Sequence, residues 1–195
     1  MYAEYFDAIP EDLYQQWILM ICPQGKRCLV TSGGGRTMAR TRGGKLLMRP
    51  FESILPNGSR HYRQSDVCVL DCVYDAVHWT FYILDVMCWR GYAIYDCDTH
   101  FRHFWLQTRL NDPHEFDPPN GDNKFFRFKT VQPAPMDQLN QVIEDPEGYL
   151  ATHQSVSYPI DGLLFYHQQV HYQGGSTPLV GWVPRDSVGT FLKDQ

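Results

Sequence analysis

Short apolar runs separated by tight-turn signals are the feature that most constrains how this chain can fold. The turns are marked by glycine- and proline-containing sequences such as PQGK, SGGGR, LPNG and YQGG. Short strands joined by such turns predict a largely antiparallel sheet. The runs that we expect to form strands are Trp17–Cys22, Cys28–Thr31, Val67–Asp75, Trp79–Trp89, Leu163–His167 and Pro178–Val183.

Four other stretches carry helical signals: Pro10–Gln16, a segment beginning at Asp98, Pro135–Asp145 and Pro184–Leu192. The second of these presents Phe101, Phe104 and Trp105 at helical spacing, with Leu110 further along. The polar, proline-rich segment Asn111–Asn123 that follows is expected to be a long, mobile loop. Helices interspersed with antiparallel strands make α+β the expected fold class, with the helices flanking the sheets.

Length and charge limit the function classes. A chain of 195 residues that is 43% apolar can bury one core, so we expect a single domain over residues 1–195. The formal net charge of −5 argues against a protein that coats nucleic acid through a broad basic surface. Any contact with nucleic acid is therefore expected to be local.

The cysteines and histidines indicate neither a disulfide scaffold nor a metal site. Most of the six cysteines lie in apolar runs, no secretory signal opens the sequence, and no run is as long as a membrane span. We therefore expect reduced thiols in an intracellular compartment. Cys68 and Cys72 are four residues apart but fall in a strand-like run, and no second cysteine pair has zinc-ligand spacing. His167 and His171 also fall in a strand-like run, where a spacing of four does not bring ligands together.

The segment Cys22-Pro23-Gln24-Gly25-Lys26-Arg27 is a candidate anion site. A strand is expected to end at Cys22, Gly25 gives the turn its backbone freedom, and two cations follow. An ordinary hairpin with two solvated charges explains the same residues.

Four segments in order resemble the covalent nucleotidyltransferases, which include DNA ligases and capping guanylyltransferases. Their nucleophile motif, Lys-x-Asp-Gly-x-Arg, reads here with Cys22 for the lysine and Gln24 for the aspartate. Tyr82–Met87 resembles the strand that supplies an acidic residue, with Met87 where a glutamate is expected. Asp161-Gly162-Leu163-Leu164-Phe165 matches a further motif, and Pro178–Trp182 matches the last one but contains no lysine. Nucleotidyl transfer needs the lysine nucleophile and metal-binding acids, so the resemblance implies the fold without catalysis, cofactor or metal.

A closer resemblance is to the cap-binding domain of the snurportins. The longest matching runs are LDVMCWRG (84–91), DGLLFYH (161–167) and STPLVGW (176–182). This resemblance implies binding of the 2,2,7-trimethylguanosine cap of small nuclear RNA, or of the ribonucleoprotein that carries it, by an import adaptor. In the full-length family the partners include importin β and an export receptor, and the protein shuttles between cytoplasm and nucleus. The basic segment that binds importin β in the family is absent from this sequence, and no membrane association is expected.

The same resemblance assigns the cap base to Trp182. N7 methylation makes the base cationic and two N2 methyl groups remove its amine donors, so an aromatic face and apolar walls suit it. Gly181 precedes Trp182 and is expected to give a ligand room to approach. The other four tryptophans lie in runs better explained as core: Trp17, Trp79, Trp89 and Trp105.

The triphosphate of the cap is assigned to cations. Lys26, Arg27 and Arg42 are the candidates, and Arg42 aligns with a family lysine, a role that an arginine can fulfil. Cys22 and Gly25 complete this part of the expected pocket. Arg36 and Arg40 are expected to be solvated instead.

The N-terminal Tyr2, Ala3 and Tyr5 align with a family stretch that contacts the cap and the second nucleotide. Tyr2 replaces an aliphatic residue, Ala3 a serine and Tyr5 a tryptophan, and a tyrosine can still stack on a base. A frayed terminus is the alternative for this segment. For the chain as a whole, the alternatives are a residual nucleotidyltransferase, a 7-methylguanosine cap binder and a protein-interaction platform.

Overall fold

The apolar runs form the central strands of two separate sheets in a computed structural model that describes residues 1–193. Each sheet belongs to one of two units. The first unit comprises residues 1–24, 98–100 and 131–193, and the second comprises residues 25–97 and 101–130. The chain therefore passes from the first unit to the second between Gln24 and Gly25.

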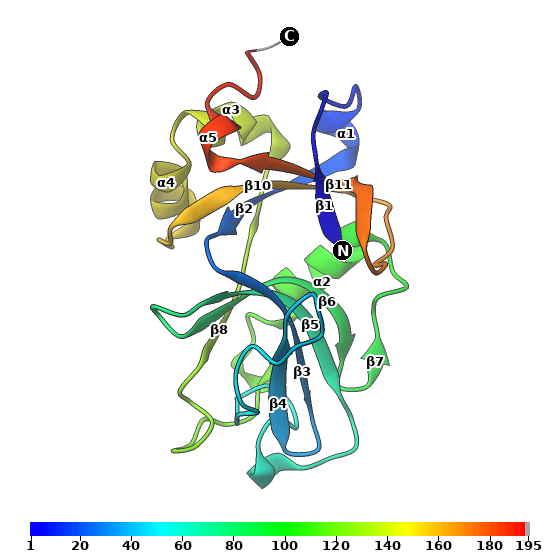
Figure 1. Ribbon diagram of the computed structural model, residues 1–195, viewed down its shortest axis with the longest axis vertical. Helices are drawn as coiled ribbons and strands as arrows, with labels where there is room; N and C mark the ends of the chain where they lie inside the picture. Colours follow the sequence, from blue (N-terminus) through cyan, green and yellow to red (C-terminus); the bar gives the residue numbers. More distant parts are fainter. Residues whose placement is uncertain (194–195) are drawn as a thin grey trace. The chain divides into compact units, whose positions relative to one another are not determined.

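The first sheet has five strands in the order β1-β11-β10-β2-β9 (Figure 1). β10 pairs antiparallel with both β2 and β11, whereas β1 lies parallel to β11 at the edge. The strands are β1 (Tyr2–Tyr5), β2 (Trp17–Pro23), β9 (Pro133–Ala134), β10 (Ile160–His167) and β11 (Ser176–Pro184). The helices of this unit are α1 (Leu13–Gln16), α3 (Leu139–Glu144), α4 (Pro146–Tyr149) and α5 (Arg185–Val188), with a 3-10 turn at Met136–Gln138 and a π-turn at Leu150–Gln154.

The second sheet follows the order β4-β3-β5-β6-β7, and β8 pairs in parallel with β6. Phe81 of β6 lies at its core, with ring centroids 4.6 Å from Tyr74 and 5.1 Å from Phe128. The strands are β3 (Lys26–Gly33), β4 (Arg36–Arg40), β5 (Cys68–Asp75), β6 (Thr80–Trp89), β7 (Tyr92–Ala93) and β8 (Arg127–Thr130). α2 (Thr99–Arg109) and 3-10 turns at Arg60–Tyr62 and Pro113–Glu115 complete the elements.

The expected α+β class with mainly antiparallel sheets is confirmed, and each of the six predicted strands is present. The helices are shorter than predicted: α5 covers four residues of the predicted Pro184–Leu192, and α1 covers four of Pro10–Gln16. β4 was not predicted as a strand. No helix within residues 1–193 is long and apolar enough to cross a membrane.

The buried side of α2 differs from the aromatic side that the sequence suggests. Phe101 and Phe104 are 46% and 60% exposed, whereas Arg102, Leu106 and Leu110 lie inside. Arg102 can occupy this side because its guanidinium donates to both carboxylate oxygens of Asp85, at 2.8 and 3.0 Å, and to the Cys97 carbonyl at 2.7 Å. The specific ion pair, and not apolar spacing, orients the helix.

Trp79 and the loop Asn111–Asn123 differ from what the sequence predicts. Trp79, expected in the core, is 51% exposed in the turn between β5 and β6. The loop Asn111–Asn123 is tied to the rest of its unit, since the Asp117 N–H donates to the Ile54 carbonyl and the Trp89 indole N–H donates to Glu115. None of the six cysteines forms a disulfide within the described part of the chain.

Candidate functional site

Trp182 lies in β11 of the first sheet, between β1 and β10. It pairs with Leu164 of β10 on one side and with Tyr5 of β1 on the other. Its side chain is half-buried, whereas Tyr5 is 70% exposed. Paired residues share a face of a sheet, so Tyr5 and Trp182 form an aromatic pair on one face.

Gly162 provides the space in which the Trp182 indole lies. A Cβ atom on Gly162 would stand 2.7 Å from Cη2 and 2.8 Å from Cζ2 of Trp182, and closer still to the Val183 carbonyl oxygen. Gly162 pairs with Cys22 of β2 and with Pro184 of β11. Cys22, Gly162 and Trp182 therefore share one face of the sheet, and the indole crosses the glycine.

Gly181 has a different role from the expected one. The space above it is occupied by the Phe6 ring, which a Cβ atom on Gly181 would overlap. The Phe6 ring also contacts Trp17, Phe165 and Phe191, with centroids 5.3, 5.4 and 6.2 Å away. Gly181 thus admits a core side chain and not a ligand.

The N-terminal segment is a strand, so the frayed-terminus alternative is wrong. The Tyr2 N–H donates to the Gly175 carbonyl at 2.9 Å and the Phe6 N–H to the Trp182 carbonyl at 3.3 Å. Tyr2 and Ala3 are half-buried and pair with Ser176 and Thr177 of β11. β1 therefore holds Tyr5 at a fixed position beside Trp182.

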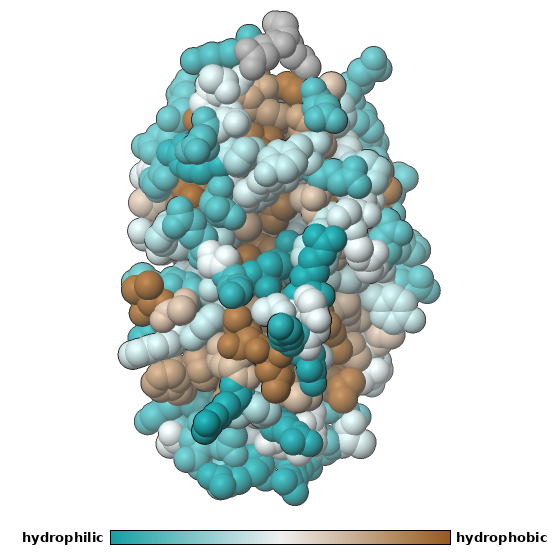
Figure 2. All heavy atoms as spheres, in the orientation of Figure 1, coloured by the Kyte–Doolittle hydropathy of each residue, from teal (hydrophilic) through white to brown (hydrophobic). Residues whose placement is uncertain are grey.

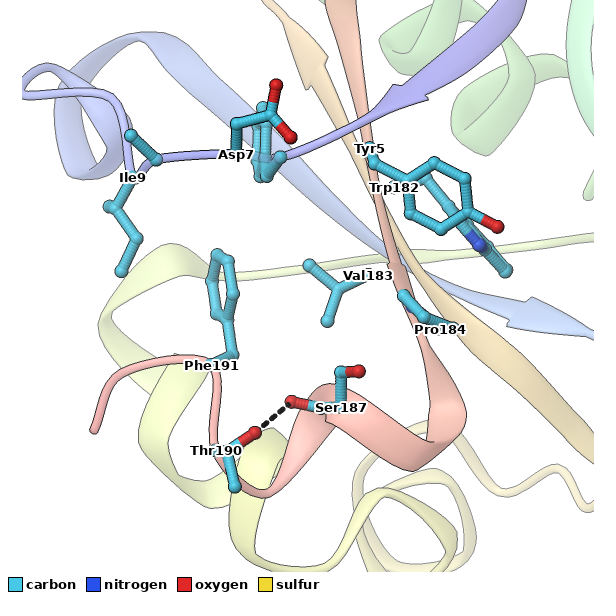
Figure 3. Close-up of a pocket in the computed structure, with 11 residues that line it drawn as sticks. Tyr5, Asp7, Ile9, Trp182, Val183, Pro184, Ser187, Thr190 and Phe191 are labelled. Atoms are coloured by element: carbon cyan, nitrogen blue, oxygen red, sulfur yellow. Dashed lines mark hydrogen bonds between the residues drawn. The ribbon is translucent and has the colours of Figure 1, made fainter. Parts of the chain in front are cut away.

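A pocket of about 380 Å³ opens beside this aromatic pair (Figure 3). Figure 3 shows Tyr5 and Trp182 on the other side of β11 from Val183 and Phe191. Ile9, Val183 and Phe191 give the pocket apolar walls, and Asp7, Ser187 and Thr190 give it polar atoms. Of the residues predicted for the first unit, Tyr5 and Trp182 line this pocket, while Tyr2, Ala3 and Cys22 do not.

Cys22 is a packing residue at the end of β2. It is only 6% exposed, and its Sγ lies 3.6 Å from the Pro23 carbonyl oxygen. The next polar residue, Gln24, uses its side-chain amide to donate to the Ile160 carbonyl at 3.1 Å. Both side chains hold the strand end in place.

In the second unit, Gly25 begins the turn into β3. Its φ of +153° and the closeness of Val73 Cγ1, 2.8 Å from a Cβ atom placed there, require a glycine. Lys26 is exposed and pairs with Tyr74 of β5. The predicted backbone freedom of Gly25 is thus confirmed.

Arg27 forms a two-point ion pair with Asp71 of β5. Its Nε and Nη2 lie 2.5 and 2.6 Å from the two carboxylate oxygens. Asp71 is 6% exposed and the Arg27 side chain 23%. The charge of Arg27 is therefore largely offset by a carboxylate of its own unit.

Arg42 is exposed in the turn after β4, where the Thr41 N–H donates to the Lys45 carbonyl at 2.8 Å. The ladder between β3 and β4 pairs Leu29 with Arg40. The turn with Arg42 consequently leaves the sheet at the end of β3 that carries Lys26 and Arg27. Lys26, Arg27 and Arg42 therefore lie at the same end of the β3–β4 hairpin.

Asp85 stands in the segment that resembles the acid-supplying strand of the nucleotidyltransferases. Its side chain is fully buried, and its carboxylate accepts from Arg102 and from the Val86 N–H. Met87, two residues on, is half-buried, and its carbonyl accepts from Ile94 and Tyr95. The Asp85 carboxylate thus forms an ion pair and hydrogen bonds inside the second unit.

A family model described as "Snurportin1, m3G cap-binding domain" matches residues 1–184. Among solved structures, the ligase domain of M. tuberculosis LigD has a TM-score of 0.56 and 16% identity over 93% of this chain and 57% of that one. Mycobacterial DNA ligase D, solved with ATP and MES, gives 0.57 and 15% over 94% and 58%. A Lig E DNA ligase gives 0.54 and 13% over 94% and 67%. The chain spans a little over half the length of the first two ligase chains, and at these identities the likeness concerns the fold.

Proposed function

Because the chain belongs to the family of the snurportin m3G cap-binding domain, we propose that it binds the 2,2,7-trimethylguanosine cap of small nuclear RNA. Its role would be cargo recognition in a nuclear import adaptor. The observation that carries this proposal is the Trp182 indole lying across Gly162, with Tyr5 beside it on the same face. A fixed, half-buried aromatic ring is what a cationic, methylated base requires as a stacking partner.

The face of the first sheet that carries Tyr5 and Trp182 is the proposed platform for the methylated base. Val183 and Phe191 of the adjoining pocket lie on the other side of β11 from this pair (Figure 3), so the methyl groups are not assigned to them. Tyr5, exposed next to Trp182, can stack on the second nucleotide. Tyr2 and Ala3, fixed in β1, remain proposed contacts for the same end of the ligand.

Lys26, Arg27 and Arg42 are proposed for the phosphates, together with the turn at Gly25. Lys26 and Arg42 are exposed, whereas Asp71 offsets the charge of Arg27. Three cations at one hairpin end supply a local positive surface on a chain of net charge −5.

We further propose that the chain does not transfer nucleotides. Cys22 and Gln24 stand at the positions of the lysine and the aspartate, and both are engaged in holding the end of β2. Cys28, the next cysteine, is unsuited to replace the nucleophile: burial, reinforced by the charge of Asp71 and opposed by that of Arg27, raises its pKa to about 12. A protonated, buried thiol is a poor nucleophile.

The likeness to ligases in fold makes a residual nucleotidyltransferase the second candidate. Lys26 is the lysine nearest to the altered motif and is exposed. Incubation with labelled GTP and magnesium or manganese separates the two candidates. A protein–GMP adduct that hydroxylamine releases would establish catalysis, and its absence is expected.

The decisive experiment is a fluorescence titration with trimethylguanosine, 7-methylguanosine and unmethylated cap dinucleotides. We expect the trimethylated cap to bind tightest, and Trp182→Ala to weaken it by about 1–3 kcal/mol. Tyr92→Ala is the matched control, since Tyr92 is an aromatic residue with 78% exposure in the second unit. Wild-type affinity in Trp182→Ala would refute the proposed stacking site, and tighter binding of the 7-methylguanosine cap would refute the proposed ligand.

The proposed cellular role rests on the same family membership. We infer that the full-length protein associates with trimethylguanosine-capped ribonucleoprotein, importin β and an export receptor, and shuttles between cytoplasm and nucleus. Co-precipitation of capped small nuclear RNA from cell extract by the wild type, and not by Trp182→Ala, tests the cargo step.

A further inference from the structure

The turn between β5 and β6 exposes apolar side chains that the core does not use. Val77 is 80% exposed and Trp79 is 51% exposed, although most neighbouring residues of both strands are buried. Figure 2 shows hydrophobic atoms protruding at the left of the view, where Figure 1 has the tip of this hairpin. Trp79 has a φ of +49°, in the left-handed region that bulky residues rarely adopt. A tryptophan held outward in this way suggests a function.

Phe125 makes Trp79 part of an aromatic pair. Their ring centroids are 4.8 Å apart with 37° between the planes, and Phe125 is 55% exposed. The adjacent Phe126 belongs to the core, and its ring centroid lies 5.6 Å from that of Phe81. Phe125 therefore faces outward, whereas Phe126 faces inward. The Arg127 N–H donates to the Trp79 carbonyl at 3.0 Å and fixes the start of β8 against the turn.

A pocket of about 550 Å³ opens beside this pair, and two cations and a histidine are among its other lining residues. Lys124 and Arg127 are exposed cations in its wall, and His78 lies between Val77 and Trp79. No carboxylate is among its lining residues, which are Val77, His78, Trp79, Gly121, Lys124, Phe125 and Arg127.

The carboxylates nearby in the sequence have partners. Asp75 is buried and accepts from His78 Nδ1 at 2.7 Å. Asp122 accepts from Arg60 Nη2 at 3.2 Å and lies 3.3 Å from His61 Nε2. Lys124 and Arg127 therefore present positive charge on a chain whose net charge is −5.

We propose that this surface of the second unit, formed by Trp79, Phe125, Lys124 and Arg127, binds single-stranded nucleic acid. Exposed aromatic rings can stack on an unpaired base, and the flanking cations can contact the phosphates on either side of it. The pocket volume lies within the range of about 300–1,000 Å³ that is usual for ligand sites. A duplex has no unpaired base available to stack on Trp79 or Phe125, because its bases are stacked on one another. One part of this proposal, that the natural strand is RNA, rests on the proposed cap binding.

The test is fluorescence anisotropy of a labelled, uncapped ten-nucleotide oligouridine at low salt. Trp79→Ala should weaken binding about 5- to 150-fold, the loss expected for one stacked base. Phe125→Ala should weaken it in the same direction. The matched controls are Tyr92→Ala for an exposed ring and Arg49→Ala for an exposed cation, and both should bind as the wild type does. Thermal unfolding checks that each variant is folded.

A second arm tests the cations. The double variant Lys124→Ala/Arg127→Ala should reduce the slope of log affinity against log salt by about 1.4, since each neutralised single-strand phosphate contributes about 0.7. A duplex of the same length should bind more weakly than the single strand. Oligodeoxythymidine serves as the DNA arm and should bind through the same residues.

Unchanged affinity in Trp79→Ala and Phe125→Ala would overturn the proposal and leave the patch to a protein partner. Equal affinity for the duplex would overturn it as well, because charge alone would then explain binding. The wild-type titration with the capped dinucleotide is independent of these outcomes. If the wild-type protein binds oligouridine but not the capped dinucleotide, the proposed cap-binding function is refuted and the single-strand site is not.

Discussion

Gly162 and Trp182 lie on neighbouring strands so closely that a single methyl group on the glycine would stand 2.7 Å from the indole. Gly162 lies in β10 and Trp182 in β11, and Gly162 also pairs with Cys22 of β2 on its other side. The position of the proposed stacking ring is therefore decided by a residue without a side chain. This relationship leads to the first prediction.

Gly162→Ala should displace the Trp182 indole and weaken trimethylguanosine cap binding. We expect a loss approaching that of Trp182→Ala, about 1–3 kcal/mol, and a destabilisation of about 1–3 kcal/mol from overpacking. Cap titration and urea unfolding measure the two effects. Gly174→Ala is the control, because no atom lies within 4 Å of a Cβ placed there. Full cap affinity in a folded Gly162→Ala would show that the indole position does not matter.

Arg42→Ala should weaken methylated and unmethylated caps equally, because a phosphate contact does not sense the base. The expected loss is about 1 kcal/mol, at the upper end for an ion pair at an exposed position. Titrations at several salt concentrations should show a shallower salt dependence than in the wild type. A loss confined to the trimethylated cap would place Arg42 at the base instead.

Arg102→Met should destabilise the chain strongly, because it leaves the fully buried Asp85 carboxylate without its cation. Breaking one side of such a pair removes about 3–5 kcal/mol. The double variant Arg102→Met/Asp85→Leu should recover much of this loss, since no buried charge remains. Urea denaturation measures both. A single variant as stable as the wild type would contradict the role given to the pair.

Asp75 should make stability depend on acid pH. Burial alone would raise its pKa, but hydrogen bonds from the His78 side chain and from the N–H groups of His78 and Val77 outweigh burial, and the pKa lies below its ordinary value of 3.8. The folded state therefore binds this proton more weakly than the unfolded state. The resulting stability is present above about pH 4 and is lost as the pH falls through the folded pKa.

Asp75→Asn tests that dependence. Urea denaturation at pH values from about 6 down to about 2 should show a smaller loss of stability in the variant than in the wild type. At neutral pH the variant should be the less stable of the two, because the ionised hydrogen bonds are gone. Parallel curves for the two proteins would contradict the assignment.

The central strands could be predicted from the sequence because their signals are local. Val67–Asp75 and Trp79–Trp89 are apolar, β-rich and bounded by turn residues, and they form β5 and β6 with small shifts at their ends. β4 could not be predicted from the sequence, because Arg36–Arg40 contains no apolar run. These residues form a strand because each of them pairs with a residue of β3.

The side chains that decide the candidate site depend on residues far apart in the chain. Gly181 was expected to leave room for a ligand, yet Phe6 fills that room from the N-terminal segment. Gly162 was matched to a family motif and not proposed for the site, although it sets the indole position. A glycine within an apolar strand is the signal that could have indicated it, because such a glycine often marks a close approach.

The outward position of Trp79 could not be derived from its own surroundings in the sequence. Its run continues into the buried strand β6, and its exposure depends on the left-handed turn and on Phe125, 46 positions later in the chain. The same limit applies to α2, whose buried side was decided by Asp85. Aromatic content alone does not distinguish a ring that fills the core from one that faces solvent.

The parallel pairing of β1 with β11 has a consequence for how the chain folds. Residues 2–5 find their partners only at residues 176–182, so this ladder closes one of the longest loops that the chain can form. Contacts of such high sequence separation slow folding. During synthesis Tyr5 can pair with Trp182 only after residues 176–182 have left the ribosome. The β1–β11 ladder, which places Tyr5 beside Trp182, is thus expected to form later than the β5–β6 hairpin, whose paired residues are close in the sequence.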